Sequence, residues 1–342
     1  MDFTAVREAA SARLDPETWD YFLGSADGDH DRDARAWSRW DLVPRVMTEL
    51  TAIDTTVSLG GETFSSPLVL APSASQGAAD PAGEIATRRA AAARGLLAGY
   101  SFHATVEVER FAAAADAPWW AQAFTIEDRS ISDNYLRRCA AAGASAVVLT
   151  VDVPGPLADT PWRRLALSAP VADRGNYPRD AEGRAIPVVT ESKIGTSDIA
   201  RTADICGLPV WVKGIMTAVD ARRAIDAGAA GVYVSNHGRR QLAAVAPTAA
   251  VLRDVTDGVE GRVPVIVDGG IRSGTDVVRA LALGASAVAI GRPVPWALAA
   301  GGREMLDRVL DTLVDEVRAA TAGLGAGRIA DLVPEMVRPA FV

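Results

Sequence analysis

The stretch "VDGGIRSGTDVVRALALGASAVAIGRP", residues 267–293, contains the end of one apolar strand, a helix that ends at a glycine, and a complete second strand. The segments "AAAGASAVV" and "DAGAAGVYV" earlier in the chain repeat this transition from a helix through glycine into a strand. A strand–helix–strand unit joins parallel strands. Its repetition predicts an α/β protein with a parallel sheet.

Apolar runs of the same kind recur along the chain, and alanine-rich helical stretches such as 84–95 and 219–230 separate most of them. Eight parallel strands fit a closed (β/α)8 TIM barrel better than an open doubly wound sheet. The predicted strands cover residues 67–72, 95–101, 118–124, 146–152, 209–214, 231–236, 264–269 and 286–291.

We expect residues 1–342 to form a single domain. Residues 1–65 are predicted to form an N-terminal helical extension, with helices over 2–14 and near 16–26. The barrel is expected over 66–300 and C-terminal helices over 301–342. The connection 153–195, after the fourth strand, is rich in Pro, Gly, Asp and Arg and is either a lid loop or disordered.

Composition narrows the function classes. The net charge of -8 argues against a nucleic-acid partner but leaves room for a local basic pocket. No apolar run approaches the roughly 20 residues of a membrane span, and the N-terminus does not resemble a signal peptide. The two cysteines, Cys139 and Cys206, lie far apart in apolar surroundings, which favours a cytoplasmic protein. We expect no metal site.

Polar residues gather where the predicted strands end, and active sites of such barrels lie at the carboxyl ends of the strands. The last two ends carry glycines with Arg272 and Arg292, a pattern that predicts phosphate binding. After the sixth strand, "SNHGRRQL" (235–242) is either a polar loop or a base with an anion clamp. The strand-end residues are Pro72, Ser73, Ala74, Ser101, Gln122, Phe124, Thr150, Asp152, Lys213, Ser235, His237, Arg240, Asp268, Gly269, Gly270, Arg272, Gly291 and Arg292.

These motifs make the chain resemble the FMN-dependent 2-hydroxy-acid oxidase and dehydrogenase family, which includes glycolate oxidase, lactate oxidase and mandelate dehydrogenase. The resemblance runs from about residue 16 to 332, with "APSA", "LTVDVP" and "WVKG" in register. It implies that FMN binds across the barrel mouth. The implied FMN contacts are Pro72, Ser73, Ala74, Ser101, Gln122, Thr150, Lys213, Ser235, Asp268, Gly270, Arg272, Gly291 and Arg292.

The resemblance also assigns catalytic roles for oxidation of a small-molecule 2-hydroxy acid to a 2-oxo acid. His237 is the base that takes the hydroxyl proton, and Asp152 stabilises the resulting imidazolium. Arg240 clamps the substrate carboxylate, and Lys213 favours negative charge on the reduced flavin. Tyr21 matches the family's N-terminal active-site tyrosine. Hydride transfer to flavin N5 and a carbanion mechanism use the same residues, so both stay open, as does the electron acceptor.

The expected substrate site departs from the family pattern. Phe124 stands where the family usually has a tyrosine that hydrogen-bonds the substrate. The second carboxylate-binding arginine of the family is missing from its usual place. Without an insertion, Asp159 falls there and would repel the substrate carboxylate; with an insertion, Arg163 or Arg164 takes over the role. Both alternatives stay open. Arg239 is expected to face solvent, and His103 is a further candidate for the pocket.

These departures favour a substrate larger than glycolate or lactate, packed against Phe124, Phe102 and Trp162. The alternatives are an FMN enzyme of a specialised pathway with an atypical substrate and a catalytically impaired flavin-binding homologue. The FMN-dependent isopentenyl diphosphate isomerase fits less well because it lacks the histidine–arginine pair. The resemblance further implies a homo-oligomer, with a homotetramer expected.

Overall fold

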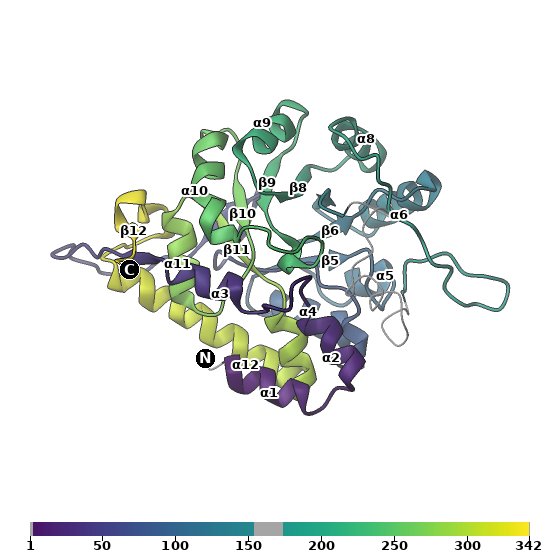
Figure 1. Cartoon of the computed structure of the whole chain (residues 1–342), viewed down its shortest axis with the longest axis horizontal. Coiled ribbons are helices and arrows are strands. Elements are labelled where there is room, and N and C mark those ends of the chain that lie inside the picture. Colours follow the sequence, from purple (N-terminus) through teal and green to yellow (C-terminus); the bar gives the residue numbers. More distant parts are fainter. Residues whose placement is uncertain (1–2, 154–173, 342) are drawn as a thin grey trace.

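The structure is a computed structural model that describes residues 3–153 and 174–341. Its centre is a closed barrel of parallel strands in the order β10-β11-β4-β5-β6-β7-β8-β9 (Figure 1). Each strand coincides with one of the predicted apolar runs, so the predicted barrel is confirmed. The strands are β4 (Leu68–Leu70), β5 (Leu97–Ser101), β6 (Trp119–Ala123), β7 (Ala146–Thr150), β8 (Val210–Ile215), β9 (Gly231–Val234), β10 (Val265–Val267) and β11 (Ala287–Ile290).

Helices connect the strands and cover the outside of the barrel (Figure 1). Three of them begin at a side-chain cap: Asp128, Thr217 and Ser273 each accept a hydrogen bond from a backbone N–H of the first helical turn. Each such cap stabilises a helix by about 1 kcal/mol. The connecting helices are α4 (Gly83–Ala92), α5 (Val108–Ala112), α6 (Arg129–Ala141), α8 (Ser197–Cys206), α9 (Ala218–Asp226), α10 (Thr248–Val259) and α11 (Gly274–Ala282).

The amino-terminal end of the barrel is filled and closed. A hairpin of β2 (Val57–Leu59) and β3 (Glu62–Phe64) buries Leu59 against the residues near the beginning of the barrel strands. Trp120 and Trp211 pack there with ring centroids 4.5 Å apart. Because this end is occupied by apolar side chains, the functional groups have room only at the other end.

The N-terminal extension, residues 1–65, has helices in its first part, as expected, and short strands in its second. It contains α1 (Phe3–Ser11), α2 (Pro16–Leu23) and α3 (Arg32–Trp37), but also β2, β3 and β1 (Trp40–Leu42). The Trp37 indole N–H donates to the Gly269 carbonyl at 2.8 Å. This bond fixes α3 against the end of the seventh barrel strand.

The segment 301–342 contains the expected helical structure but also a short strand. The helix α12 (Pro293–Gly323) begins before residue 301 and bends at Gly302, whose φ is 61°. After it the chain forms short 3-10 turns and β12 (Val337–Pro339), which pairs antiparallel with β1. The prolines Pro334 and Pro339 disfavour a further helix there.

The predicted lid over 153–195 lies partly outside the described residues. Where the chain resumes, the Gly175 N–H donates to the Ala104 carbonyl at 2.9 Å. The following segment then projects away from the barrel (Figure 1) and returns to pair Thr190 with Ile126. In the described parts of the chain, no helix is both long and apolar enough to cross a membrane.

Candidate active site

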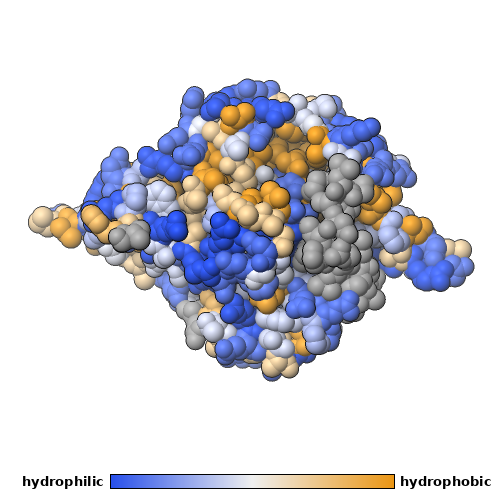
Figure 2. Space-filling model, in the orientation of Figure 1, coloured by the Kyte–Doolittle hydropathy of each residue, from blue (hydrophilic) through white to orange (hydrophobic). Residues whose placement is uncertain are grey.

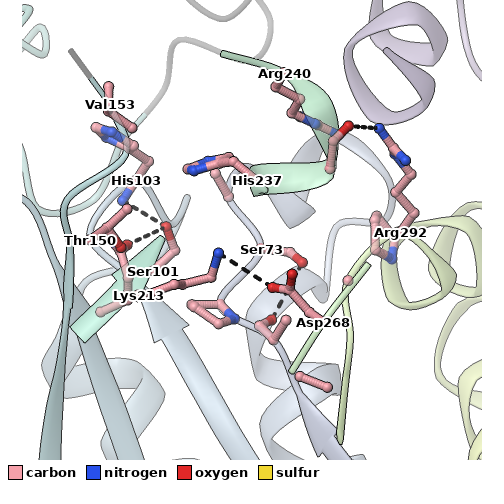
Figure 3. Close-up of a pocket in the computed structure, with 18 of the residues that line it drawn as sticks. Ser73, Ser101, His103, Thr150, Val153, Lys213, His237, Arg240, Asp268 and Arg292 are labelled. Atoms are coloured by element: carbon pink, nitrogen blue, oxygen red, sulfur yellow. Dashed lines mark hydrogen bonds and ion pairs between the residues drawn. The ribbon is translucent and has the colours of Figure 1, made fainter. Parts of the chain in front are cut away.

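A cavity opens at the carboxyl end of the barrel, with a volume of about 1520 Å³ including the solvent-open space at its mouth. Figure 3 shows labelled side chains from separate strand ends around it. The structure therefore brings most of the predicted site together. The predicted residues that line the cavity are Tyr21, Pro72, Ser73, Ala74, Ser101, Gln122, Phe124, Thr150, Lys213, His237, Arg240, Asp268, Gly270, Arg272, Gly291 and Arg292.

His237 and Asp152 form the predicted pair. The His237 Nδ1 lies 3.1 Å from Asp152 Oδ1, although the two residues follow different strands. Burial opposes the charged form of Asp152, but the charge and hydrogen bond of His237 and the charge of Lys213 outweigh it and lower the pKa of this carboxyl. Asp152 is therefore a carboxylate at neutral pH, placed to stabilise a protonated His237.

The loop that carries His237 has a strained backbone. His237, Gly238 and Arg239 have φ values of 56°, 61° and 61°, in the left-handed region that side-chain-bearing residues rarely adopt. The Ser235 hydroxyl accepts a hydrogen bond from the His237 N–H at 3.2 Å. Arg292 donates to the Gly238 carbonyl at 2.6 Å. Such strain persists only where surrounding contacts hold the loop in place.

Arg239 does not face solvent, so that prediction is wrong. Its side chain is 1% exposed and forms an ion pair with Asp27 of the N-terminal extension. It also donates to the Asp29 carbonyl at 3.1 Å, and its own carbonyl accepts from the Ala26 N–H at 2.7 Å. The extension thus holds the His237 loop through a buried ion pair and backbone hydrogen bonds.

Lys213 lies deep in the cavity, between two strand ends. Its Nζ donates to the Ser235 hydroxyl at 2.5 Å and lies 3.3 Å from Asp268 Oδ2. Ser235, a predicted cofactor contact, is completely buried and is not among the residues that line the cavity; its hydroxyl supports Lys213 and the His237 loop. These contacts fix the ammonium group at the base of the cavity (Figure 3).

Arg240 and Tyr21 meet on the opposite side of the mouth. The Arg240 guanidinium lies 5.5 Å from the centre of the Tyr21 ring and donates to the Phe22 carbonyl at 3.1 Å. Burial, together with the charge of Arg292, lowers the pKa of Arg240 to about 9. A positive charge in this position is stabilised when an anion binds beside it.

Arg272 and Arg292, the two arginines predicted to bind phosphate, both line the cavity. Burial, followed by the charge of Arg292, lowers the pKa of Arg272 to about 10, and the guanidinium lies 4.9 Å from the centre of the Trp296 ring. Gly270 has a φ of 77°, and a Cβ there would lie 2.2 Å from the Asp33 carbonyl carbon. Packing against α3 therefore already requires this glycine, whatever it contributes to an anion.

Two observations show that these residues fit a phosphate-bearing cofactor. Asp268 Oδ1 and Arg292 Nε are buried without a hydrogen-bond partner among the described residues, and both residues line the cavity. A Cβ at Gly291 would have no neighbouring atom within 4 Å. A buried acceptor, a buried donor and open space beside a glycine are what a ligand with hydroxyl and phosphate groups requires.

The floor of the cavity is a hydrogen-bonded polar network. The Gln122 side-chain amide donates to the Thr150 hydroxyl at 3.0 Å, and its carbonyl oxygen accepts from Ser101 at 3.3 Å. Tight pairing of this kind holds the side chains in one arrangement. The predicted contacts Ser101, Gln122 and Thr150 are thus supported as a preorganised surface.

Sequence reasoning missed part of the substrate side of the cavity. Arg174 and Tyr177 line it with His103, but nothing in "DRGNYP" marks them as site residues. Phe102 is completely buried and does not line the cavity, so its expected substrate contact is wrong. Its ring packs in the core, with its centroid 4.9 Å from that of Tyr135, because the chain turns directly after β5. The proposed clamps Arg163 and Arg164, together with Asp159 and Trp162, lie outside the described residues.

Comparison with known proteins agrees with this geometry. The family model for FMN-dependent dehydrogenases matches residues 10–339. The peroxisomal (S)-2-hydroxyacid oxidase of Arabidopsis thaliana is 36% identical over 351 residues, which cover 97% of this chain and 94% of that protein. The glycolate oxidase of Spinacia oleracea is 36% identical over 349 residues, which cover 97% of this chain and 95% of that protein.

A solved structure of mandelate oxidase with benzoyl-formic acid aligns with a TM-score of 0.89 and 33% sequence identity, covering 99% of this chain and 98% of that one. The alignment extends over the barrel, the N-terminal extension and the C-terminal segment, because nearly all of both chains is covered. The chain therefore belongs to the FMN-dependent dehydrogenase family.

Proposed function

We propose that this enzyme oxidises a 2-hydroxy acid to a 2-oxo acid, with His237 as the general base. The observation that carries the proposal is one cavity lined by Lys213, His237 and Arg240, with Asp152 paired to His237; these residues come from three neighbouring strand ends. The names of the similar oxidases, which include (S)-2-hydroxyacid oxidase and glycolate oxidase, support the same substrate class.

The cofactor would be held along the cavity floor. Arg272, Arg292 and Gly291 are the candidates for its phosphate, Asp268 for its ribityl hydroxyls, and the network of Gln122 for its ring system. When bound, FMN supplies the acceptor for the hydrogen and two electrons removed from substrate C2. Lys213 contributes a fixed positive charge, which favours that uptake of negative charge.

The substrate would lie above that floor, between the two polar sides of the mouth. Arg240 binds the carboxylate, since a guanidinium matches two carboxylate oxygens at once. His237 accepts the hydroxyl proton on Nε2, because its Nδ1 is engaged by Asp152. The carboxylate of Asp152 then stabilises the imidazolium that forms, and Tyr21 closes the cavity beside Arg240.

We further propose that the preferred substrate is larger than glycolate or lactate. Phe124 lines the cavity with an apolar ring where a small acid would need a polar partner. Burying apolar substrate area contributes about 25 cal/mol per Å², which offsets a missing hydrogen bond. The competing proposal is that Arg163 or Arg164 binds small acids from the segment outside the described residues.

The test is flavin bleaching under anaerobic conditions with glycolate, lactate, mandelate and phenyllactate. Wild-type protein purified with FMN should lose its visible flavin absorption with at least one of the larger acids, and the variant His237→Ala should retain FMN but bleach about 100-fold or more slowly. Absence of bleaching with every acid would support an atypical substrate or an impaired homologue. Fastest turnover of glycolate or lactate would contradict the larger substrate.

Assembly and location are also proposals. We propose that the protein assembles as a homotetramer. Val46 and Met47 are 71% and 94% exposed, so the segment that projects at the left of Figures 1 and 2 ends in an apolar tip that a second copy could cover. Light scattering on the holoenzyme would report the mass of the assembly. Cys139 and Cys206 are both free thiols, which supports a reducing compartment such as the cytoplasm. Fluorescence microscopy of a tagged chain tests that location.

A further inference from the structure

A second polar cluster lines the same cavity beside Phe124. The His103 ring stacks on the Phe124 ring, with centroids 4.8 Å and planes 29° apart. The Tyr177 hydroxyl lies 2.9 Å from His103 Nδ1. Arg174 is 3% exposed and lines the cavity with both. None of these three residues has a part in the chemistry described above.

The backbone that carries Arg174 and Tyr177 is bound to the barrel independently of the cluster. The Gly175 N–H donates to the Ala104 carbonyl at 2.9 Å. The Asn176 side-chain amide donates to the Tyr100 hydroxyl at 2.7 Å and to the Phe102 carbonyl at 3.2 Å. Contacts of this kind place the two side chains over the cavity before any ligand arrives.

The protonation states of His103 and Tyr177 limit which group donates and which accepts in the cluster. Burial, followed by the charges of Arg174 and His237, lowers the pKa of His103 well below its ordinary value, so the ring is neutral. Burial raises the pKa of Tyr177 to about 12, although the charge of Arg174 and a hydrogen bond from it act in the opposite sense. The Tyr177 hydroxyl is therefore protonated at neutral pH.

The chemistry of Arg174 sets the donor and the acceptor in each hydrogen bond of the cluster. Arg174 lies close enough to Tyr177 to lower the pKa of its hydroxyl by charge and by a hydrogen bond, and a guanidinium only donates. A Tyr177 oxygen that accepts from Arg174 leaves its own O–H to donate to His103 Nδ1. A neutral imidazole that accepts at Nδ1 carries its hydrogen on Nε2. His103 is partly accessible and lines the cavity, so this N–H is the group available to a ligand there. Figure 3 shows His103 and His237 above Lys213.

We propose that Arg174, Tyr177 and His103 form a hydrogen-bonded chain whose last N–H donates to an oxygen of the bound 2-hydroxy acid, in place of the hydroxyl that Phe124 lacks. The proposal rests on the proposed function, because it needs a hydroxy acid beside His237. A cation at one end strengthens each hydrogen bond of such a chain. His103 contacts the substrate, while Tyr177 and Arg174 act as positioning residues.

The variant Tyr177→Phe keeps the ring and breaks the chain. With the acid from the panel that bleaches wild-type flavin fastest, its kcat/KM should fall about tenfold, the usual effect of losing one hydrogen bond to a charged group. Its FMN content should equal that of wild type, since Tyr177 contacts no proposed cofactor residue. The variant His103→Phe keeps the stack on Phe124 and should lose a similar factor, which gives a second route to the same result.

The decisive control restores the donor from another position. In the background of Tyr177→Phe, the substitution Phe124→Tyr places a hydroxyl on the ring against which His103 stacks. This double variant should recover most of the tenfold loss, measured against Tyr177→Phe alone. If Tyr177 only supports the loop, the hydroxyl added at position 124 cannot replace its role, and kcat/KM should not recover.

Two outcomes would overturn the proposal. One is a Tyr177→Phe enzyme with wild-type kcat/KM, and the other is a loss that Phe124→Tyr leaves unchanged. Either result leaves the proposed function intact, because the wild-type enzyme still bleaches with its best acid. A wild-type flavin that no hydroxy acid bleaches would instead refute the proposed function at the first step.

Discussion

The substitution Asp152→Asn tests whether the buried carboxylate acts through His237. The amide oxygen of asparagine can still accept the Nδ1 hydrogen across the 3.1 Å separation, so the orientation of the ring is kept and the negative charge is lost. A hydrogen bond to a charged group is worth about 1.5–3 kcal/mol. If Asp152→Asn loses this stabilisation only in the state with protonated His237, the barrier to flavin reduction rises by the same amount. Flavin reduction should then slow by about 10- to 100-fold.

The assay is anaerobic stopped-flow reduction of the flavin at saturating substrate, compared across Asp152→Asn, His237→Ala and the double variant. Residues that act as a unit have strongly non-additive effects, so the double variant should reduce flavin at the rate of His237→Ala alone. FMN content serves as the control, since neither residue contacts the proposed phosphate site. The reasoning fails if Asp152→Asn reduces flavin at the wild-type rate, or if the two losses multiply.

Three further predictions follow from individual contacts. Replacing Arg292 by Ala should weaken FMN retention by about 10- to 100-fold, measured as released flavin on dilution, because a charge-assisted phosphate bond is lost; unchanged retention would contradict its assignment. Arg239→Ala should lower the free energy of unfolding of the holoenzyme by about 3 kcal/mol in denaturant. This is the lower end of the range for a buried ion pair because Asp27 is 22% exposed, and an unchanged unfolding midpoint would argue against the pair. Because the folded pKa of Asp152 is lowered, the stability that its carboxylate contributes should be complete above its unfolded pKa of about 4 and be lost as the pH falls through the folded pKa; a difference in unfolding free energy from Asp152→Asn that is the same at every pH below about 4 would oppose this.

The barrel and the cofactor side of the site were predictable because both follow from local sequence. Each strand is a short apolar run, and parallel strands deliver their last residues to the same mouth. Lys213 and Asp268 therefore come within 3.3 Å of each other although they lie far apart in the chain. Their positions needed only the strand boundaries and the closure of the barrel.

The substrate side was less predictable because it depends on contacts between loops. An arginine in a polar loop has the same local sequence signal whether it meets solvent or Asp27, so the burial of Arg239 could not be inferred. Phe102 was expected to pack against a larger substrate, but the turn after β5 sends its ring into the core. Tyr177 enters the site through side-chain contacts with a segment more than seventy residues earlier.

Arg292 connects the cofactor side of the site with the substrate side. This side chain lines the proposed phosphate site, and its guanidinium donates to the Gly238 carbonyl at 2.6 Å and the Gly24 carbonyl at 2.7 Å. It therefore braces both the strained His237 loop and the N-terminal extension. Adding excess FMN to Arg292→Ala should restore binding but not the geometry of His237, because the lost carbonyl contacts belong to the protein. Flavin reduction in that variant should stay slow even when its cofactor site is saturated.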